Sequence, residues 1–222
     1  MKKFGAVMKR VSVLVMGGLM VAGMATNASA ALITFNFEEL ATNAGTPSVA
    51  STQGGVTATV HRRDNLAISV TDLGTIAGGP ASWGSRTIGN FVSPSTSPSG
   101  DLVVDLSSLT TAANISFGDY DADDDATVFL IAYSGLGGTG AMLAFNSVAY
   151  PATNDIRFGG ERTLSVAAAG IRSLVVVSGG TFLNSLYYDN LQVEAVPEPG
   201  SLLLFGTGIA GLVAARRRQA KK

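Results

Sequence analysis

Acidic side chains are the most prominent candidates for chemistry in this sequence. Five of them fall within seven residues: Asp119, Asp121, Asp123, Asp124 and Asp125. Like charges at this spacing repel one another unless water or a cation screens them. The Asp-x-Asp-x-Asp spacing resembles the start of a calcium-binding EF-hand loop, but Asp124 stands where that loop needs glycine and Leu130 where it needs glutamate. We therefore predict either a solvated hairpin loop or a different calcium site, with Asp119, Asp121, Asp123 and Asp125 as ligands.

Residues for nucleophilic catalysis are scarce. The only histidine is His61, which we expect to be exposed at the end of a strand, and there is no cysteine. A serine hydrolase would need His61 as its base, and no Gly-x-Ser-x-Gly elbow is present. A glycosidase needs only two opposed carboxylates, which any acidic chain can supply. We predict a protein that is not an enzyme and keep an exported hydrolase as an alternative.

Trp83 is the only tryptophan, and it lies in a stretch rich in glycine and serine. An exposed Trp83 could stack on a sugar ring, with Arg86 donating hydrogen bonds to the sugar hydroxyls. Alternatively, Trp83 fills one end of a hydrophobic core. The sequence leaves both interpretations open.

Strands must position these residues, because alternating apolar and polar residues dominate the chain from Ala31 to Ala195. Glycine-rich turns separate the strands, which is typical of an antiparallel sandwich or barrel, and the number of strands favours a jelly roll. We read 41–52 and 93–100 as loops. The predicted strands are Ile33–Phe37, Val56–His61, Leu66–Val70, Leu102–Leu106, Asn114–Phe117, Thr127–Tyr133, Ala141–Phe145, Thr163–Ala167, Ser173–Val177 and Ser185–Val193.

The two ends of this region resemble galactose-binding-like jelly rolls, a fold of many carbohydrate-binding modules. The resemblance rests on the Phe-Glu at Phe37-Glu38 near the start and on Asp189-Asn190 near the end. It implies that the first and last strands pair and that Glu38 and Asp189 lie at a structural calcium. Carboxylate and carbonyl oxygens are the ligands that calcium prefers. The alternative is that both are surface carboxylates beside strands.

The charge of the chain is unevenly distributed. Between Ala31 and Pro199 the chain has no lysine, six arginines and all sixteen acidic residues, a formal charge of −10. An acidic surface does not attract phosphates, so we expect no nucleic-acid partner.

The first thirty residues have the layout of a secretory signal. Four basic residues precede the uncharged apolar run from Val11 to Ala25, and the small residues Ala28 and Ala30 follow it. We predict that signal peptidase cleaves after Ala30. The alternative is an uncleaved N-terminal membrane anchor.

The C-terminus carries a second apolar run, from Ser201 to Ala215, followed by Arg216, Arg217 and Arg218. A helix of that length covers about 22 Å, against about 30 Å for the core of a bilayer. It is therefore a marginal membrane span, and the arginines are expected to stay in the cytoplasm. The alternative is an ordinary C-terminal anchor.

Val196, Pro197, Glu198 and Pro199 precede this run, and the complete order resembles a PEP-CTERM sorting signal. The resemblance implies a Gram-negative host that often makes exopolysaccharide, and removal of the tail near the Pro-Glu-Pro by a membrane-embedded exosortase. This tail is sometimes labelled an ice-binding-protein C-terminal domain, but a sorting signal does not indicate ice binding.

Together these patterns predict a signal peptide (residues 1–30, a helix), an exported β-sandwich (31–195) and a sorting signal with a membrane helix (196–222). We expect passage through the inner membrane, transient anchoring there, and a final location at the cell surface or outside the cell. The expected role is non-catalytic association with exopolysaccharide. A structural matrix protein without a specific ligand is the alternative from another class.

Overall fold

The computed structural model of the chain describes residues 30–75, 79–89, 101–119, 125–149, 161–180 and 186–196, together with positions 207, 208, 211 and 216. The chain divides into two compact units: Ala30–Val196, and a second unit formed by Met1–Ser29 with Pro197–Lys222. The four described positions of the second unit are helical. The described residues include no helix long and apolar enough to cross a membrane. The predicted signal helix and most of the predicted membrane helix lie outside the described residues.

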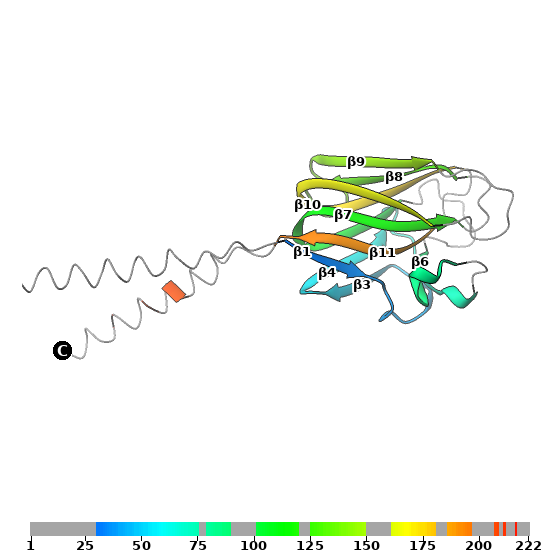
Figure 1. Ribbon diagram of the computed structural model, residues 1–222, viewed down its shortest axis with the longest axis horizontal. Coiled ribbons are helices and arrows are strands. Elements are labelled where there is room, and N and C mark those ends of the chain that lie inside the picture. The colour runs from blue at the N-terminus through cyan, green and yellow to red at the C-terminus, as the bar shows by residue number, and fades with distance from the viewer. Residues whose placement is uncertain are drawn as a thin grey trace, which may run out of the picture. The chain divides into compact units, whose positions relative to one another are not determined.

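The first unit is built from antiparallel strands and two short 3-10 turns (Figure 1). The prediction of an all-β antiparallel fold is confirmed. The elements are β1 (Ala31–Phe35), β2 (Asn43–Thr46), β3 (Ser48–Gln53), β4 (Val56–Arg62), β5 (Ile68–Asp72), η1 (Leu73–Thr75), η2 (Ala81–Trp83), β6 (Arg86–Gly89), β7 (Leu102–Asp119), β8 (Asp125–Tyr133), β9 (Met142–Ala149), β10 (Arg162–Gly180) and β11 (Leu186–Ala195).

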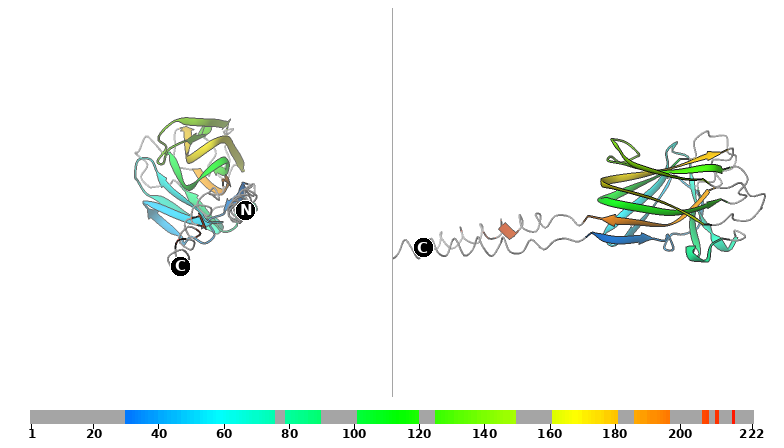
Figure 2. Two further views of the ribbon diagram at one scale, coloured as in Figure 1. Left: turned by 90° about the vertical axis from the view of Figure 1, so that its left-hand side faces the viewer. Right: turned by 45° about the horizontal axis from the view of Figure 1, so that its top comes forward.

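Two long strands, β7 and β10, connect the two layers of the sandwich. The second half of β7 and the first half of β10 lie in one layer with β11, which pairs β7 on one side and β6 and β1 on the other. The first half of β7 and the second half of β10 lie in the other layer, with β3, β4, β8 and β9. The end-on view of Figure 2 shows the strands surrounding the core.

The β7–β10 ribbon changes layer where its pairing is irregular. The register shifts twice on β10, between Ala167 and Ile171 and between Ile171 and Ser173. Gly170 lies in this segment with a φ of +86°, a backbone conformation that costs glycine little. Bends and bulges of this kind allow one strand to serve two packed sheets. The irregularity therefore forms a corner at one end of the domain.

The first and last strands of the unit are neighbours, as the jelly-roll resemblance implies. Ala31 pairs with Ala195 and Phe35 pairs with Leu191. The chain therefore enters and leaves the domain at the same end, the end at which the β7–β10 ribbon bends. The backbone N–H of Val196 donates to the carbonyl of Leu109 in this bend, at 2.9 Å. We call this the terminal end of the domain.

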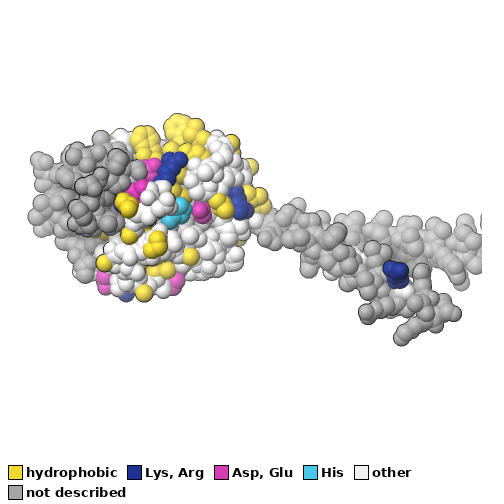
Figure 3. Space-filling view, turned by 180° about the vertical axis from the view of Figure 1, so that it is seen from behind, with side chains coloured by type: hydrophobic (Ala, Val, Ile, Leu, Met, Phe, Trp, Pro, Cys, Tyr) yellow, Lys and Arg dark blue, Asp and Glu magenta, His cyan; other side chains and the backbone are white. Residues whose placement is uncertain are grey.

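Apolar side chains at alternating strand positions fill the core between the layers. In β4 every second residue from Val56 to Arg62 is buried and the residues between them are half-buried, which is the period of a strand with one face on the core. Each layer contributes buried aliphatic or aromatic side chains, such as Phe35, Ile115 and Leu174. On the outer face shown in Figure 3, uncharged side chains predominate and charged ones are scattered.

Several predicted boundaries were wrong. The segment read as a loop over 41–52 contains β2 and most of β3, and β6 was not predicted. The predicted strands Leu102–Leu106 and Asn114–Phe117 are parts of β7, and Thr163–Ala167 and Ser173–Val177 are parts of β10. The predicted loop at 93–100 lies outside the described residues.

Candidate functional site

Three carboxylates gather at the end of the domain opposite the terminal end. Glu38 follows β1, Glu161 precedes β10, and Asp189 lies in β11. The charges of Glu38 and Glu161 both act on Asp189. The loop from Ser82 to Arg86 supplies most of the polar partners of these groups. We call Glu38, Glu161 and Asp189 the acidic cluster, and this end of the domain the acidic end.

Glu38 is held by the loop before β6. Its carboxylate accepts hydrogen bonds from the backbone N–H groups of Ser85 (2.7 Å) and Arg86 (2.8 Å) and from the Ser85 hydroxyl (2.6 Å). Burial raises the pKa of Glu38, but these hydrogen bonds and the Arg86 guanidinium outweigh it, so the pKa lies below its ordinary value. A Cβ at position 84 would lie 2.5 Å from Glu38 Oε1, so Gly84 permits this close approach. Glu38 is therefore an ionised carboxylate at neutral pH.

Glu161 has a similar set of donors. The Ser82 hydroxyl donates to its carboxylate at 2.9 Å, and the side chains of Ser116 and Trp83 lie close enough to lower its pKa as well. Burial raises the pKa of Glu161, but these side chains together lower it by more than burial raises it. The pKa therefore lies below its ordinary value. Two ionised carboxylates thus flank Asp189.

A bulge in β11 turns Asp189 toward the interior. Between Asp189 and Gln192 the strand advances three residues while β7 advances two, from Ser116 to Asn114. Asn190 takes up the extra residue at a φ of +47°, a conformation that asparagine tolerates. The alternation of β11 shifts by one at this point, so that Tyr188 and Asp189 are both buried. Asp189 has an exposed fraction of 0%.

Asp189 is only partly satisfied in this position. Its Oδ1 accepts a hydrogen bond from the backbone N–H of Asn190 at 2.6 Å, whereas Oδ2 is buried and has no hydrogen-bond partner among the described residues. Burial raises the pKa of Asp189 to about 8; the Asn190 bond opposes this rise, and the charges of Glu38 and Glu161 add to it. The acidic cluster therefore consists of two ionised carboxylates and a third that holds a proton at neutral pH.

A proton or a cation could neutralise this site. Glu38 and Asp189, which the sequence predicted as calcium ligands, do lie near each other, and the structure adds Glu161. Among the described residues, however, no three His, Asp or Glu side chains are placed to hold one metal ion. Glu38 and Glu161 would have to exchange hydrogen-bond partners to bind a cation, so the site is not preformed for calcium.

The remaining predicted acidic ligands are only partly described. Asp119 ends β7 and Asp125 begins β8, whereas Asp121 and Asp123 lie outside the described residues. The predicted hairpin is wrong in its connectivity, because β10 lies between β7 and β8 in the sheet. The prediction that these aspartates bind calcium remains a prediction.

Trp83 is part of the core of the acidic end. It is 1% exposed and packs with Leu73 and Tyr187 in a small apolar cluster. This corrects the idea of an exposed platform for sugar and matches the alternative that Trp83 fills one end of the core. Arg86 is tied down as well, because its guanidinium contacts Asp72 at 3.2 Å and the Ser85 carbonyl at 3.2 Å.

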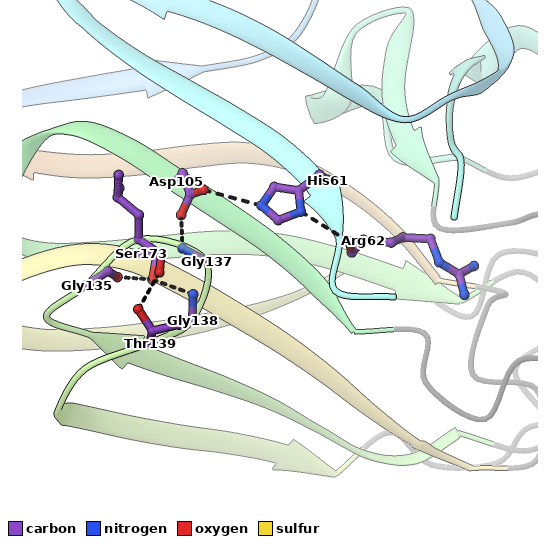
Figure 4. A network of polar contacts seen from close by, with 9 residues as sticks. His61, Arg62, Asp105, Gly135, Gly137, Gly138, Thr139 and Ser173 are labelled. Carbon is purple, nitrogen blue, oxygen red and sulfur yellow. Dashed lines mark hydrogen bonds and ion pairs between the residues drawn. The ribbon is translucent and has the colours of Figure 1, made fainter. Parts of the chain in front are cut away.

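His61 belongs to a structural network on the outer face of the other layer (Figure 4). Its Nε2 lies 3.3 Å from Asp105 Oδ2, and its Nδ1 lies 3.1 Å from the Arg62 carbonyl oxygen. Asp105 Oδ1 accepts the Gly137 N–H at 2.6 Å, which fastens the β8–β9 loop to the sheet. Among the described residues, no serine hydroxyl is hydrogen-bonded to the imidazole; the Ser173 hydroxyl in Figure 4 donates to the Gly135 carbonyl. The network does not form a catalytic triad, and His61 is half-buried rather than exposed.

A shallow groove lies on the outer face of the layer that contains β1, β11, β7 and β10. It has a volume of about 340 Å³. Cross-strand neighbours form its floor, because Asn114 of β7 pairs with both Gln192 of β11 and Ser165 of β10. Its lining residues are Leu32, Ala112, Ala113, Asn114, Ser165, Val166, Ala167, Gln192 and Glu194.

The groove combines small and neutral polar side chains. Alanines keep its floor low, and the Asn114 amide donates to Gln192 Oε1 at 3.3 Å. Its one charged side chain, Glu194, accepts a hydrogen bond from the Thr111 hydroxyl at 2.8 Å. The sequence analysis missed this groove, because short polar residues on an outer strand face carry no motif.

Comparison with known proteins identifies the C-terminal segment. Residues 195–218 match the PEP-CTERM protein-sorting motif. The resemblance noted in the sequence is therefore confirmed, and the motif implies processing by an exosortase. A search of curated proteins finds no match.

The solved structures similar to this chain include adhesin domains and a carbohydrate-binding module. The K1 cleaved adhesin domain of Lys-gingipain from Porphyromonas gingivalis W83 is 13% identical, with a TM-score of 0.48 over 74% of this chain and 98% of that one. The K2 cleaved adhesin domain is 15% identical, with a TM-score of 0.46 over 73% and 99%. The mannan-recognising carbohydrate-binding module TmCBM27 is 11% identical, with a TM-score of 0.31 over 74% and 95%. No function is transferred from similarity at this level.

Proposed function

We propose that this protein is exported, processed by an exosortase near Pro197–Pro199, and acts at the cell surface or in the extracellular matrix as a non-catalytic domain that binds polysaccharide. The groove on the layer of β1, β11, β7 and β10 is the observation that carries this proposal. The same proposal includes signal peptidase cleavage after Ala30, a domain over 31–195, and the galactose-binding-like jelly-roll form of the sandwich. The pairing of β1 with β11 supports that form.

The chemistry of the groove fits a neutral, hydroxyl-rich chain. The amides of Asn114 and Gln192 and the hydroxyl of Ser165 can each donate and accept hydrogen bonds, as sugar hydroxyls do. The groove is open at the surface and contains no basic residue, so it suits a segment of polymer better than a phosphate. An extended polysaccharide, such as the exopolysaccharide of the host, would lie along the floor and contact both amides.

Glycan binding tests this proposal. Purified full-length chain is titrated with the host exopolysaccharide and with a panel of neutral glycans. The N114A/Q192A double variant should lose binding by at least about tenfold, since two hydrogen-bonding partners are removed. The control is T52A/T57A, which removes a hydrogen-bonded pair of threonines on β3 and β4 in the other layer. Equal binding by both double variants, or no binding to any glycan, would reject the groove and favour a structural matrix role.

Processing is tested separately by intact-mass analysis of the protein released by an exosortase-positive host. The expected mass corresponds to a chain that begins at Ala31 and ends near Pro197–Pro199. A released species that still contains Arg216–Arg218 would contradict removal of the tail.

We also propose that calcium can replace the proton on Asp189. The support is the buried Oδ2 atom, which has no hydrogen-bond partner among the described residues, next to two ionised carboxylates. Glu38 and Glu161 would complete the ligand set after giving up some of their present donors. The metal would then fasten the ends of β1 and β11 and the start of β10 together, and it would have a structural rather than a catalytic role.

A further inference from the structure

Exposed apolar side chains concentrate at the terminal end of the domain. Leu32 is 68% exposed, Leu109 is 46% exposed and Val196 is 38% exposed. Leu32 pairs with Glu194 of β11, Val196 directly follows β11, and the Val196 N–H donates to the Leu109 carbonyl. The three side chains therefore form one patch on three neighbouring segments. We call Leu32, Leu109 and Val196 the terminal patch.

Small residues and one arginine lie near this patch. Ala167 and Ala169 lie exposed in the bend of β10. Arg172, half-buried, follows Ile171, which pairs with Thr110 next to Leu109. The carboxylate nearest in the pairing is Glu194, whose charge is partly satisfied by Thr111. An apolar patch with an arginine at its edge suits the interface of an anionic bilayer, where the guanidinium can reach the headgroups.

The length of the connecting chain is the second argument. Only Pro197 to Gly200 separate Val196 from the apolar run that begins at Ser201. Four residues span at most about 14 Å even when fully extended. On the N-terminal side, only Thr26 to Ala30 separate the apolar run that ends at Ala25 from β1. Either tether keeps the same end of the domain near a membrane and raises the local concentration of the patch at its surface.

We infer that the terminal patch is a lipid-docking surface, which rests on the bilayer while the chain is anchored. This inference depends on the membrane anchoring in the proposed function. Docking would present the start of the sorting motif at the membrane surface, since Val196, whose N–H is bonded to Leu109 at the sheet edge, lies at the start of the motif. It would also point the acidic end away from the membrane.

Single cysteines can test this surface because the chain contains none of its own. Leu109→Cys places a polarity-sensitive probe in the terminal patch. Leu66→Cys is the matched control, because Leu66 is 44% exposed and lies away from the terminal patch. It comes four residues after Arg62, which pairs with Leu102, the first residue of β7. Each full-length labelled chain is reconstituted in vesicles of phosphatidylethanolamine and phosphatidylglycerol that contain a lipid carrying a quencher. Flotation shows whether the chain is anchored, and circular dichroism shows whether it is folded.

The expected result is quenching several-fold stronger at position 109 than at position 66. Leu32→Cys should behave like Leu109→Cys and serves as the second site. Equal quenching at positions 109 and 66 in floating vesicles would overturn docking while leaving the anchor intact. A signal at position 109 that grows with protein density rather than with quencher content would identify a second copy as the occupant and also overturn it. Failure to float would overturn both the anchor and the docking that depends on it.

Discussion

The two ends of the domain use polar groups in opposite ways. At the acidic end, three loops converge on strand β11, and the carboxylates of Glu38 and Glu161 both accept hydrogen bonds. At the terminal end, β1 begins and β11 ends, and the exposed side chains include leucines instead of a cluster of carboxylates. Loops can gather distant residues into a site, whereas strand ends offer only their own side chains. The acidic end can therefore hold a proton or a cation, whereas the terminal end offers an apolar surface for attachment.

The largest expected effect comes from removing Trp83. The W83A variant should lower the free energy of unfolding by about 3–5 kcal/mol, because it leaves a cavity against Leu73 and Tyr187. The matched change at the terminal end, L109A, should cost about 0.5 kcal/mol or less, since Leu109 is half exposed. Urea denaturation measures both. Similar losses would show that the acidic end is not the better packed of the two.

The next effect concerns pH. The pKa of Asp189 is raised from 3.8 to about 8 in the folded state, so the folded protein binds this proton more tightly than the unfolded chain does. The stabilising effect is fully present below pH 3.8 and is lost at about 1.4 kcal/mol per pH unit as the pH rises toward 8. The D189N variant should lack this dependence and should exceed the natural protein in stability at pH 8.

Thermal unfolding between pH 5 and pH 9 measures this change, without calcium. D72N is the control, because Asp72 is an exposed partner of Arg86 and lies outside the acidic cluster. A D189N variant whose stability still falls with pH in parallel with the natural protein would show that another group titrates.

Calcium should raise the free energy of unfolding by a smaller amount, which depends on pH. Because calcium would bind the ionised form of Asp189, it competes with the proton, and its stabilisation should be larger at pH 9 than at pH 6. At a free concentration ten times the dissociation constant, the gain is about 1.4 kcal/mol by mass action. Melting temperatures in millimolar calcium and in chelator measure it, with D189N as the variant that should not respond. An identical shift in D189N would place the metal elsewhere, for instance at the aspartates from Asp119 to Asp125.

The smallest effect on stability is expected at the terminal patch. The L32S/L109S double variant should change the free energy of unfolding by no more than about 0.5 kcal/mol per site, since both side chains already face water. The double variant should nevertheless lose most of the docking of the domain on vesicles. A strongly destabilised double variant would mean that these leucines serve the fold rather than a surface.

Sequence patterns predicted the regular strands and failed where several strands meet. The alternation in Val56–His61 and Thr127–Tyr133 predicted β4 and β8 almost to the residue. The stretches Asn43–Thr46 and Ser48–Gln53 consist of small and polar residues, so their strand character depends on partners that the sequence does not reveal. Each of the long strands β7 and β10 was predicted as two strands, because no strand was predicted across Ser107–Thr110 or Ala168–Gly170, which form a bend in continuous strands.

Only two of the three residues of the acidic cluster were predicted from the sequence. Glu38 and Asp189 were paired through their resemblance to a known fold, yet the burial of Asp189 depends on a one-residue bulge that alternation does not anticipate. Glu161 has no local motif, and only the tertiary fold brings it to Ser82 and Trp83. For Trp83 the sequence left exposure and burial open, since a glycine-rich loop does not decide between them, and the structure shows that the loop folds over its own apolar side chain.

The pairing of β1 with β11 also affects when the protein can fold. Ala31 and Ala195 are the first and last residues of the sheet, and β11 is the central partner of β1, β6 and β7. In the proposed export, the sheet would close only after nearly the whole domain has crossed the membrane, and contacts so distant in sequence form slowly. The first strand would stay without its partner until β11 emerges, at about the time when the sorting motif reaches the membrane. Pairing of β1 with β11 would then mark the end of translocation.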